Sequence, residues 1–408
     1  MAKDDGSNAK ALTRQRKTHR KSRLGCANCK LRGVKPSYES VFTLSGFAAP
    51  PSPAPMSFQR VIPVALPAAG KVGDYEMRPG DMALVSRFVN DTVLTFGPRD
   101  DDAMHRDRSL LLAKAHPYLF HIFVGYAQLH QSHINVTPGS PTPSGSASMA
   151  FHWYHSAILF KQKLSELLKQ KTLHSTERDA LWMGASMLAT STFTNIDSLD
   201  PREVWPLRSA DTMDLDWLRM TQGKDIVWEV ADLSRPDSVF NSFFREMLEA
   251  DMPSGSSPVR PHSISPLFYD LFNITPDSTP ATNPYHAAVS FISQVIGDSN
   301  DLLVGRRLFG FALEIGEPFK NLLRSKDPRA LLLLVYWHSK LACYAWWAEF
   351  RGIVEGLSVC MYLRRYHADQ KHILQLLEPP RQALIHCFRK SKLVQVWSPE
   401  LVEEAEAP

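Results

Sequence analysis

The chain has 408 residues, 44% of them hydrophobic and 10% aromatic, so it is long and apolar enough to form two domains with linkers rather than a disordered chain. Five cysteines in this length exclude a small disulfide scaffold. The net charge is +4, but residues 1–35 hold eleven Lys or Arg and two Asp, a charge of +9, which leaves −5 for the rest. A basic segment on an acidic body indicates an arm that binds a polyanion.

The first 35 residues are the basic head. Five of the eight residues from Arg16 to Arg23 are cationic, namely Arg16, Lys17, Arg20, Lys21 and Arg23. Such a run is typical of a nuclear-import signal or a phosphate-binding arm, although a merely solvated tail has the same composition. If the arm neutralised about six phosphates, the logarithm of affinity would fall with the logarithm of salt concentration with a slope of about −5.

A Cys-x-x-Cys pair, Cys26 and Cys29, follows this run directly. Two thiolates on one tight turn suit two corners of a zinc tetrahedron, but the pair alone is a weak signal and chance pairing is an alternative. Thioredoxin-type redox chemistry would need a strand–helix context that the flanking sequence does not offer.

Residues 20–35 read Arg-Lys-Ser-Arg-x-Gly-Cys-x-x-Cys-Lys-x-Arg-x-Val-Lys and resemble the opening of the fungal zinc-cluster (Zn2Cys6) DNA-binding domain. In that family six cysteines hold two zinc ions, and a helix carries basic side chains into the major groove. The resemblance implies that Cys26 and Cys29 are zinc ligands. It implies DNA contacts for the basic side chains at Arg20, Lys21, Arg23, Lys30, Arg32 and Lys35.

The head departs from that family at three points. Pro36 stands where the third cysteine belongs, Gly33 replaces a basic residue, and no cysteine follows until Cys343. Two thiolates cannot close a tetrahedral site, and structural zinc supplies on the order of 10 kcal/mol to such modules. We therefore expect zinc not to be stably bound, the head to be mostly disordered, and its DNA affinity to be weak and mainly nonspecific. A gene model that lacks the segment with the other cysteines and a true degenerate paralogue both remain open.

Beyond the head, composition divides the chain into three zones. Residues 36–79 are Pro-rich and predict an extended linker. Residues 80–398 carry helical periodicity and predict an all-α body, interrupted by loops near 133–148 and 252–284. Residues 399–408 hold four glutamates and are expected to fray as an acidic tail.

Apolar stripes at three- and four-residue spacing predict individual helices in the body. One stripe runs from Leu111 to Leu129, where Pro117 fits a first turn, and another from Leu181 to Phe193, capped by Ser175 or Thr176. Residues 328–350 are apolar on most sides and predict a buried helix. The remaining cysteines, Cys343, Cys360 and Cys387, stand in such apolar sequence and are expected to be small buried hydrophobes of a protein in a reducing compartment.

Ordered motifs of the body resemble the regulatory domain of sterol uptake control proteins and related zinc-cluster regulators. They stand, unevenly spaced, at 115–121, 125–130, 154–160, 179–188, 205–207 and 214–224. The resemblance implies a multi-helix fungal transcription factor domain in the nucleus, forming a homo- or heterodimer and in some members enclosing a sterol or other apolar ligand. The aromatic segment from Trp337 to Phe350 would line such a pocket or fill a core, and the pocket residues stay unassigned.

The residues themselves favour structural roles. Trp182, Trp205, Trp217 and Trp228 are expected to anchor helix packing, and Asp214 and Asp216 to mark a helix start. Nucleophile-elbow, Walker, dinucleotide and His-Glu-x-x-His signatures are missing from the sequence, which argues against an enzyme. His116, His121, His130 and His133 are spaced over several helix faces, which disfavours a metal site. No apolar run approaches the roughly 18 residues of a membrane span.

Two functions follow as hypotheses. The first is a DNA-binding regulator of RNA polymerase II transcription, of sterol or secondary metabolism genes, with DNA binding impaired by the missing cysteines. The second is a helical ligand-binding or dimerisation module that acts on an intact relative without touching DNA.

Overall fold

The computed structural model describes residues 71–72, 75–96, 102–138, 146–170, 172–211, 214–222, 224–242, 244–245, 265–297, 308 and 310–407. The basic head and nearly all of the predicted linker therefore lie outside the described residues. In the described part the chain is helical, which confirms the all-α class. An antiparallel pair of two-residue strands, β1 (Lys71–Val72) and β2 (Tyr75–Glu76), precedes the first helix.

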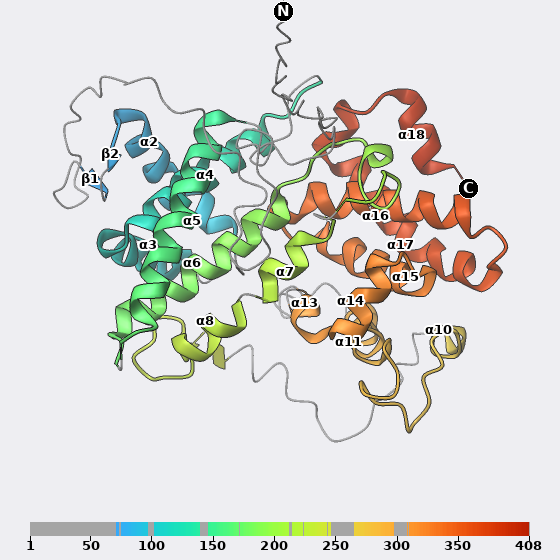
Figure 1. Cartoon of the computed structure of the whole chain (residues 1–408). Coiled ribbons are helices and arrows are strands. Elements are labelled where there is room, and N and C mark those ends of the chain that lie inside the picture. Colours follow the sequence, from blue (N-terminus) through green and yellow to red (C-terminus); the bar gives the residue numbers. More distant parts are fainter. Residues whose placement is uncertain are drawn as a thin grey trace, which may run out of the picture.

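The first group of helices lies on one side of the molecule (Figure 1). Its members are α2 (Pro79–Arg87), α3 (Asp102–Ala115), α4 (Pro117–Ile134), α5 (Ala147–Leu167), α6 (Ser175–Thr194) and α8 (Lys224–Ala231). Pro117 is the first residue of α4, as predicted, because the missing N–H of proline costs nothing there. Ser146 caps α5 by accepting the N–H of Met149 at 3.5 Å.

The second group occupies the other side, with α7 (Asp216–Gln222) between the two (Figure 1). It comprises α10 (Pro266–Leu271), α11 (His286–Gly297), α13 (Phe311–Glu314), α14 (Glu317–Arg324), α15 (Pro328–Leu341), α16 (Trp346–Tyr366), α17 (Lys371–Lys390) and α18 (Pro399–Glu406). Asp216 begins α7, as expected of a helix start, whereas Asp214 lies before it and pairs with Arg208 at 2.6 Å.

Each group has its own hydrophobic core, and α6 passes from one to the other. Leu181 and Leu188 belong to the first core, whereas Phe193 near the end of the same helix belongs to the second. There the ring of Phe193 lies edge-on to Trp217 at 5.1 Å and to Trp337 at 5.6 Å. The tryptophans are anchors, as predicted, with Trp205 and Trp217 buried and Trp182 packed on Trp228.

The prediction of one buried helix over 328–350 is wrong in its continuity. The chain forms α15, turns over residues 342–345, and begins α16 at Trp346. The apolar pattern runs through the turn because both helices pack in the second core, so periodicity carries no sign of the reversal. Extended backbone at Ala345 (φ −141°, ψ 137°) marks the break.

The expected cap of α6 is also wrong. Ser175 and Thr176 lie inside the helix, and His174 is the capping residue. Nδ1 of His174 accepts the N–H of Thr176 at 3.4 Å, and a carboxylate oxygen of Glu177 accepts the N–H of His174 at 3.2 Å. This reciprocal arrangement satisfies backbone donors that an α-helix leaves unpaired at its start.

The tail does not fray. Residues 399–406 form α18, which Ser398 caps and whose Leu401 and Ala405 are buried. Two of its glutamates pair with arginines of the second group, Glu406 with Arg389 at 2.8 Å and Glu404 with Arg365 at 3.0 Å. Although the segment holds four glutamates, Leu401 and Ala405 are four residues apart and pack the helix against the second core.

The two interruptions are shorter than predicted. The first is bounded by the end of α4 at Ile134 and the start of α5 at Ala147. The second contains α10, whose Phe268 and Tyr269 are buried in the second core. Among the described residues no helix is long and apolar enough to cross a membrane.

The cysteines are only in part the buried hydrophobes that were expected. Cys360 is buried and free, but Cys343 is exposed and forms a disulfide with Cys387, with 5.9 Å between the Cα atoms. The bond ties the turn before α16 to α17 across 44 residues. In the chain-entropy description, closing such a loop stabilises the folded state by about 4 kcal/mol.

Replacing Gly184 by alanine is expected to destabilise the first core by about 1–3 kcal/mol. An added Cβ would lie 2.7 Å from a ring carbon of Tyr118 and 2.9 Å from one of Phe160, and both rings are fully buried. Urea denaturation measures the loss. Gly80→Ala is the control, since its Cβ would meet nothing within 4 Å, and an equal loss in both variants would contradict this packing.

Candidate binding groove

The residues predicted for zinc, DNA and nuclear import all lie outside the described residues. They are Arg16, Lys17, Arg20, Lys21, Arg23, Cys26, Cys29, Lys30, Arg32 and Lys35.

The aromatic segment Trp337 to Phe350 belongs to the second core. Trp337, Trp347 and Phe350 are between 3% and 7% exposed, and the indole N–H of Trp337 donates to the carbonyl of Leu308 at 2.8 Å. Residues of this segment line neither of the two hollows described below. Of the two roles expected for it, the structure assigns it the core.

A groove of about 650 Å³ lies where the end of α5, the start of α6 and the end of α8 meet. Its apolar wall consists of Leu167, Leu168, Leu173, Trp228, Val230, Leu233 and Phe244. Its polar wall consists of Gln170, Arg178, Glu229, Asp232 and Ser234. Leu168 is 51% exposed, so part of the apolar wall faces solvent.

Trp228 is held in this wall from two sides. Its ring lies 5.1 Å from that of Trp182 on α6 and 5.0 Å from that of Phe244, both edge-on. Edge-to-face pairs of this kind add about 0.5–1.5 kcal/mol beyond the buried area. These two contacts hold the Trp228 ring in place in the apolar wall of the groove.

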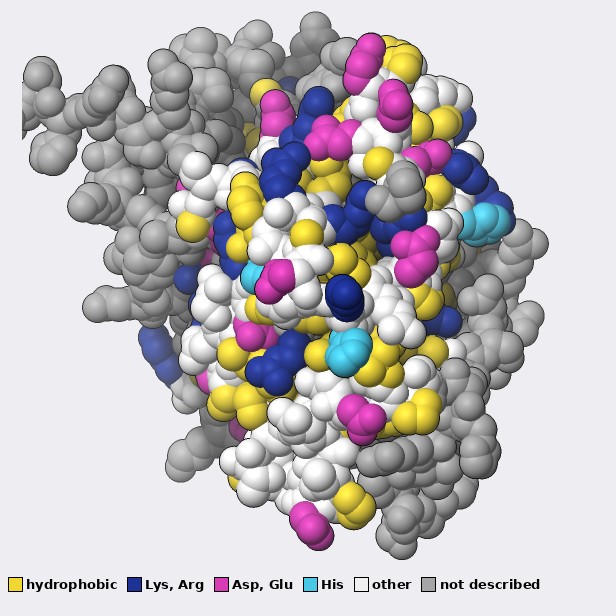
Figure 2. All heavy atoms as spheres, turned by 90° about the vertical axis from the view of Figure 1, so that its right-hand side faces the viewer, with side chains coloured by type: hydrophobic (Ala, Val, Ile, Leu, Met, Phe, Trp, Pro, Cys, Tyr) yellow, Lys and Arg dark blue, Asp and Glu magenta, His cyan; other side chains and the backbone are white. Residues whose placement is uncertain are grey.

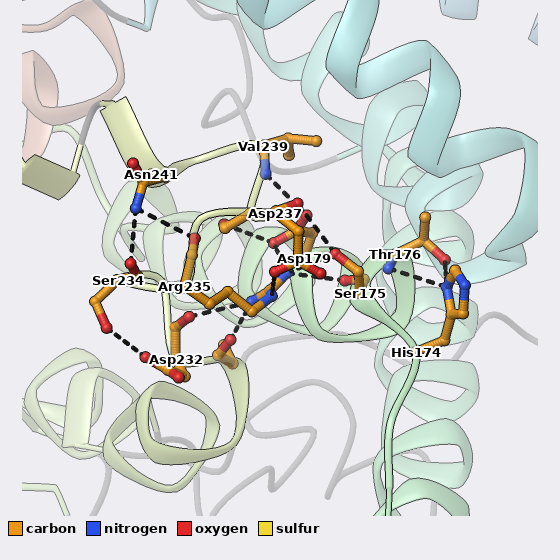
Figure 3. A network of polar contacts seen from close by, with 12 residues as sticks. His174, Ser175, Thr176, Asp179, Asp232, Ser234, Arg235, Asp237, Val239 and Asn241 are labelled. Atoms are coloured by element: carbon orange, nitrogen blue, oxygen red, sulfur yellow. Dashed lines mark hydrogen bonds and ion pairs between the residues drawn. The ribbon is translucent and has the colours of Figure 1, made fainter.

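A buried ion pair fixes the polar wall to α6 (Figure 3). The carboxylate of Asp179, 1% exposed, pairs with Arg235 and accepts the hydroxyl of Ser238 at 2.8 Å and the N–H of Val239 at 3.0 Å. Arg235 also donates to the carbonyls of Ala231 and Ser175. The loop after α8 is therefore tied at several points to the first turns of α6.

The groove residues Asp232 and Ser234 lie at the edge of this network (Figure 3). The hydroxyl of Ser234 donates to the carboxylate of Asp232 at 2.6 Å, and the amide of Asn241 donates to the Ser234 carbonyl at 2.8 Å. Asp232 has a positive φ of 44°, a conformation that aspartate adopts more readily than most residues. Network and groove form one structural unit.

The charges of the groove suit a ligand with an apolar body and a polar end. Nε of Arg178 is buried and has no hydrogen-bond partner among the described residues. Glu229 and Asp232 contribute negative charge to the same hollow. Among the described residues no group of three or more His, Cys, Asp or Glu is arranged to hold a metal ion.

A second hollow of about 620 Å³ is lined mainly by the turns between α10 and α11, with Leu322 of α14 and Arg329 of α15. Thr275 bonds to Ser278 within one turn, and the amide of Asn283 donates to the carbonyl of Phe272 at 2.9 Å across two turns. Arg329 lies over the Tyr285 ring at 4.7 Å, and the Tyr285 hydroxyl donates to Asp327 at 2.9 Å. Burial, together with Asp327, raises the pKa of Tyr285 to about 12. The polar side chains at this hollow are therefore mostly engaged in contacts with one another.

A buried charged cluster that the sequence did not predict holds α16 to the end of α6 in the second core. Arg351 of α16 donates to the carbonyl of Phe193, to the carbonyl of Asn195 at 2.5 Å and to the carboxylate of Glu355. These carbonyls end α6, where an α-helix has no partners of its own for them. Burial raises the pKa of Glu355, and burial beside Arg351 lowers the pKa of His338, 3.8 Å from Glu355, to about 3. The one signal in the sequence is an Arg–Glu pair four residues apart in an apolar helix.

The four histidines singled out from the sequence lie in three different surroundings, because His130 and His133 both pack on the Trp346 ring, at 4.5 Å and 5.5 Å between ring centres. His121 meets His152, with 2.9 Å between their Nδ1 atoms, and His130 bonds to Thr92 at 3.2 Å. His133 pairs with Glu349 at 3.0 Å, and His116 is buried beside Tyr118. They stabilise contacts between helices and share no common centre.

Removing Arg235 is expected to cost about 3 kcal/mol of folding free energy, because the Asp179 carboxylate would be left buried without its cation. Arg235→Ala and Asp179→Asn are measured by urea denaturation. Arg324→Ala is the control, since its pair with Glu317 is 43% and 54% exposed and is expected to contribute less than about 1 kcal/mol. A loss at Arg235 no larger than that of the control would contradict a supporting role for the network.

Stability is expected to fall as the pH drops below 6.5. Burial lowers the pKa of His121 to about 2 and that of His152 to about 4, so between pH 6.5 and these values the unfolded chain binds more protons than the folded one. Each histidine then adds up to about 1.4 kcal/mol per pH unit to the loss. Urea titrations at pH 7, 6 and 5 should show a shallower dependence for His121→Leu, and an unchanged one for the exposed His372→Leu. Equal slopes in all three proteins would refute this account.

No family model, curated protein or solved structure matches this chain. The likeness to zinc-cluster regulators therefore rests on the residues quoted from the sequence and stays a prediction. The structure shows a helical body of two cores, with a groove on the first and, in the second, a charged cluster that holds α16 to the end of α6.

Proposed function

We propose that this chain is a nuclear regulator of RNA polymerase II transcription of the fungal zinc-cluster type, with a DNA-contacting head and a helical regulatory body. The observation that carries the proposal is the run of residues 20–35, where a basic arm leads directly into Cys26, Cys29 and the basic residues behind them. The charge of +9 on the first 35 residues, against −5 on the rest, supports the head as the part that meets DNA.

The surface of the body also supports DNA contact through the head rather than through the body. On the face in Figure 2, Lys and Arg side chains stand among acidic and hydrophobic ones. Several basic side chains of the C-terminal helices are neutralised in pairs, as Arg389 is by Glu406 and Arg365 by Glu404. Cations that bind phosphates release the counterions condensed on DNA, and cations already paired with carboxylates on the body contribute less to this effect.

With two thiolates and Pro36 in place of a third, the head is expected to contact phosphates more than base edges. Family members acquire base-specific contacts from a helix that zinc holds in place. In this proposal zinc stays weakly bound at best, and DNA affinity depends steeply on salt.

The groove favours a second candidate function of a different class. An apolar wall that contains Trp228 and Phe244, beside the partly buried Arg178, is what a module that holds an apolar ligand with a polar end, such as a sterol, would present. In that case the chain would act by ligand binding or by pairing with an intact relative, and would read no DNA itself.

A gel-shift titration of the full chain tests the proposal. Replacing Lys30, Arg32 and Lys35 by alanine should weaken binding to duplex DNA and reduce the slope against log salt by about 2.7, because three phosphate contacts are lost. The control replaces the exposed Lys371, Lys390 and Lys392 by alanine, which changes the net charge equally.

The two functions separate in the same assay. Tighter binding to duplexes selected from a random pool than to scrambled ones supports a regulator that reads DNA. No measurable binding of the unaltered chain to duplex DNA at low salt would favour the second function, which needs no contact with DNA. Equal losses in the head and body variants would contradict the assignment of DNA contact to the head.

A further inference from the structure

Cys343 and Cys387 differ sharply in access to solvent although they are bonded to each other. Cys343 stands exposed in the turn between α15 and α16, whereas Cys387 in α17 is 6% exposed. The remaining cysteine of the body, Cys360, is 2% exposed and unbonded, and burial raises its pKa to about 12. Cys343 is therefore accessible to reagents in solution, whereas Cys387 and Cys360 are buried.

Thiol–disulfide exchange requires a thiolate to reach the sulfur that it attacks. A small thiol in solution can approach Cys343 but is kept from Cys387 by the packing of α17 in the second core. A disulfide in a reducing compartment is usually transient or redox-sensing rather than structural. That last point rests on the proposed nuclear location, whereas the accessibility of the two sulfurs does not.

We infer that Cys343 is a reversible S-thiolation site for low-molecular-weight disulfides of the glutathione type, and that Cys387 is its resolving cysteine. In the reduced chain the Cys343 thiolate attacks the small disulfide, forms a mixed disulfide and releases one small thiolate. The Cys387 thiolate then attacks Sγ of Cys343, forms the internal bond and releases the second. Two protein thiols lose two electrons and two protons, and one small disulfide becomes two small thiols.

The internal bond changes what holds the start of α16. Trp346 follows Cys343 by three residues and reaches the first group of helices, where its indole N–H donates to Thr95 at 2.8 Å and its ring packs on His130 at 4.5 Å. When the bond is closed, the turn that carries Trp346 is tied to α17. When it is open, non-covalent packing alone holds this joint between the two cores, so the oxidised chain is the more rigid.

Peptide mass spectrometry after glutathione disulfide treatment of the reduced full chain tests the order of events. Cys387→Ala should accumulate a glutathione adduct at Cys343, because the resolving thiol is gone, and alanine fills the buried position without a polar group. Cys343→Ser should carry no adduct at Cys387, and Cys360→Ala should close the internal bond as the unaltered chain does. An adduct at Cys387 in Cys343→Ser, or none at Cys343 in Cys387→Ala, would overturn the inference.

A thermal readout keeps the test independent of trapping. The unaltered chain should melt several degrees lower in reduced than in oxidised glutathione buffer, and Cys343→Ser should melt at the same temperature in both. Equal melting temperatures for the unaltered chain in the two buffers would contradict the inference that the Cys343–Cys387 bond stabilises the fold. Neither measurement involves DNA, so either can fail while the proposed function stands.

Discussion

The arrangement of the body depends on the contact between Arg351 and the end of α6. Helix α6 contributes side chains to both cores, and the carbonyls of Phe193 and Asn195 at its end accept hydrogen bonds from Arg351. Arg351 meets two of them and lies 5.3 Å from the centre of the Phe193 ring, so one side chain satisfies the helix end electrostatically and packs against its last aromatic residue. The positive charge also faces the negative end of the helix dipole.

This junction places the groove and the second core at opposite ends of one helix. In the first turns of α6, Arg178 lines the groove and Asp179 anchors its polar wall through Arg235. The last turn of the helix carries Phe193, which packs in the second core. A helix of 20 residues is about 30 Å long, so the groove and the contact with Arg351 are separated by most of that length.

Sequence reasoning succeeded where a single segment determines the outcome. The stripe at 181–193 predicted α6, and Pro117 predicted the start of α4, because these depend on neighbours along the chain. The stripe at 111–129 is helical but is divided between α3 and α4 at His116. Sequence reasoning failed where distant segments decide: the turn at 342–345 interrupts a continuous apolar pattern, and α18 is ordered by docking Leu401 and Ala405. The groove brings together residues from 167 to 244, and the disulfide spans 44 residues, so neither has a local signature.

The acceptors that Arg351 finds on α6 are main-chain oxygens, and every amino acid supplies the same oxygen. A substitution at Asn195 would therefore leave the acceptor in place, whereas the three contacts made from position 351 depend on the guanidinium group. A lysine would present a single nitrogen on a flexible stem and could not hold two carbonyls and the Glu355 carboxylate in a fixed fork. In homologous chains the junction would be recognised by an arginine with a carboxylate four residues later, even where the end of α6 has changed beyond recognition.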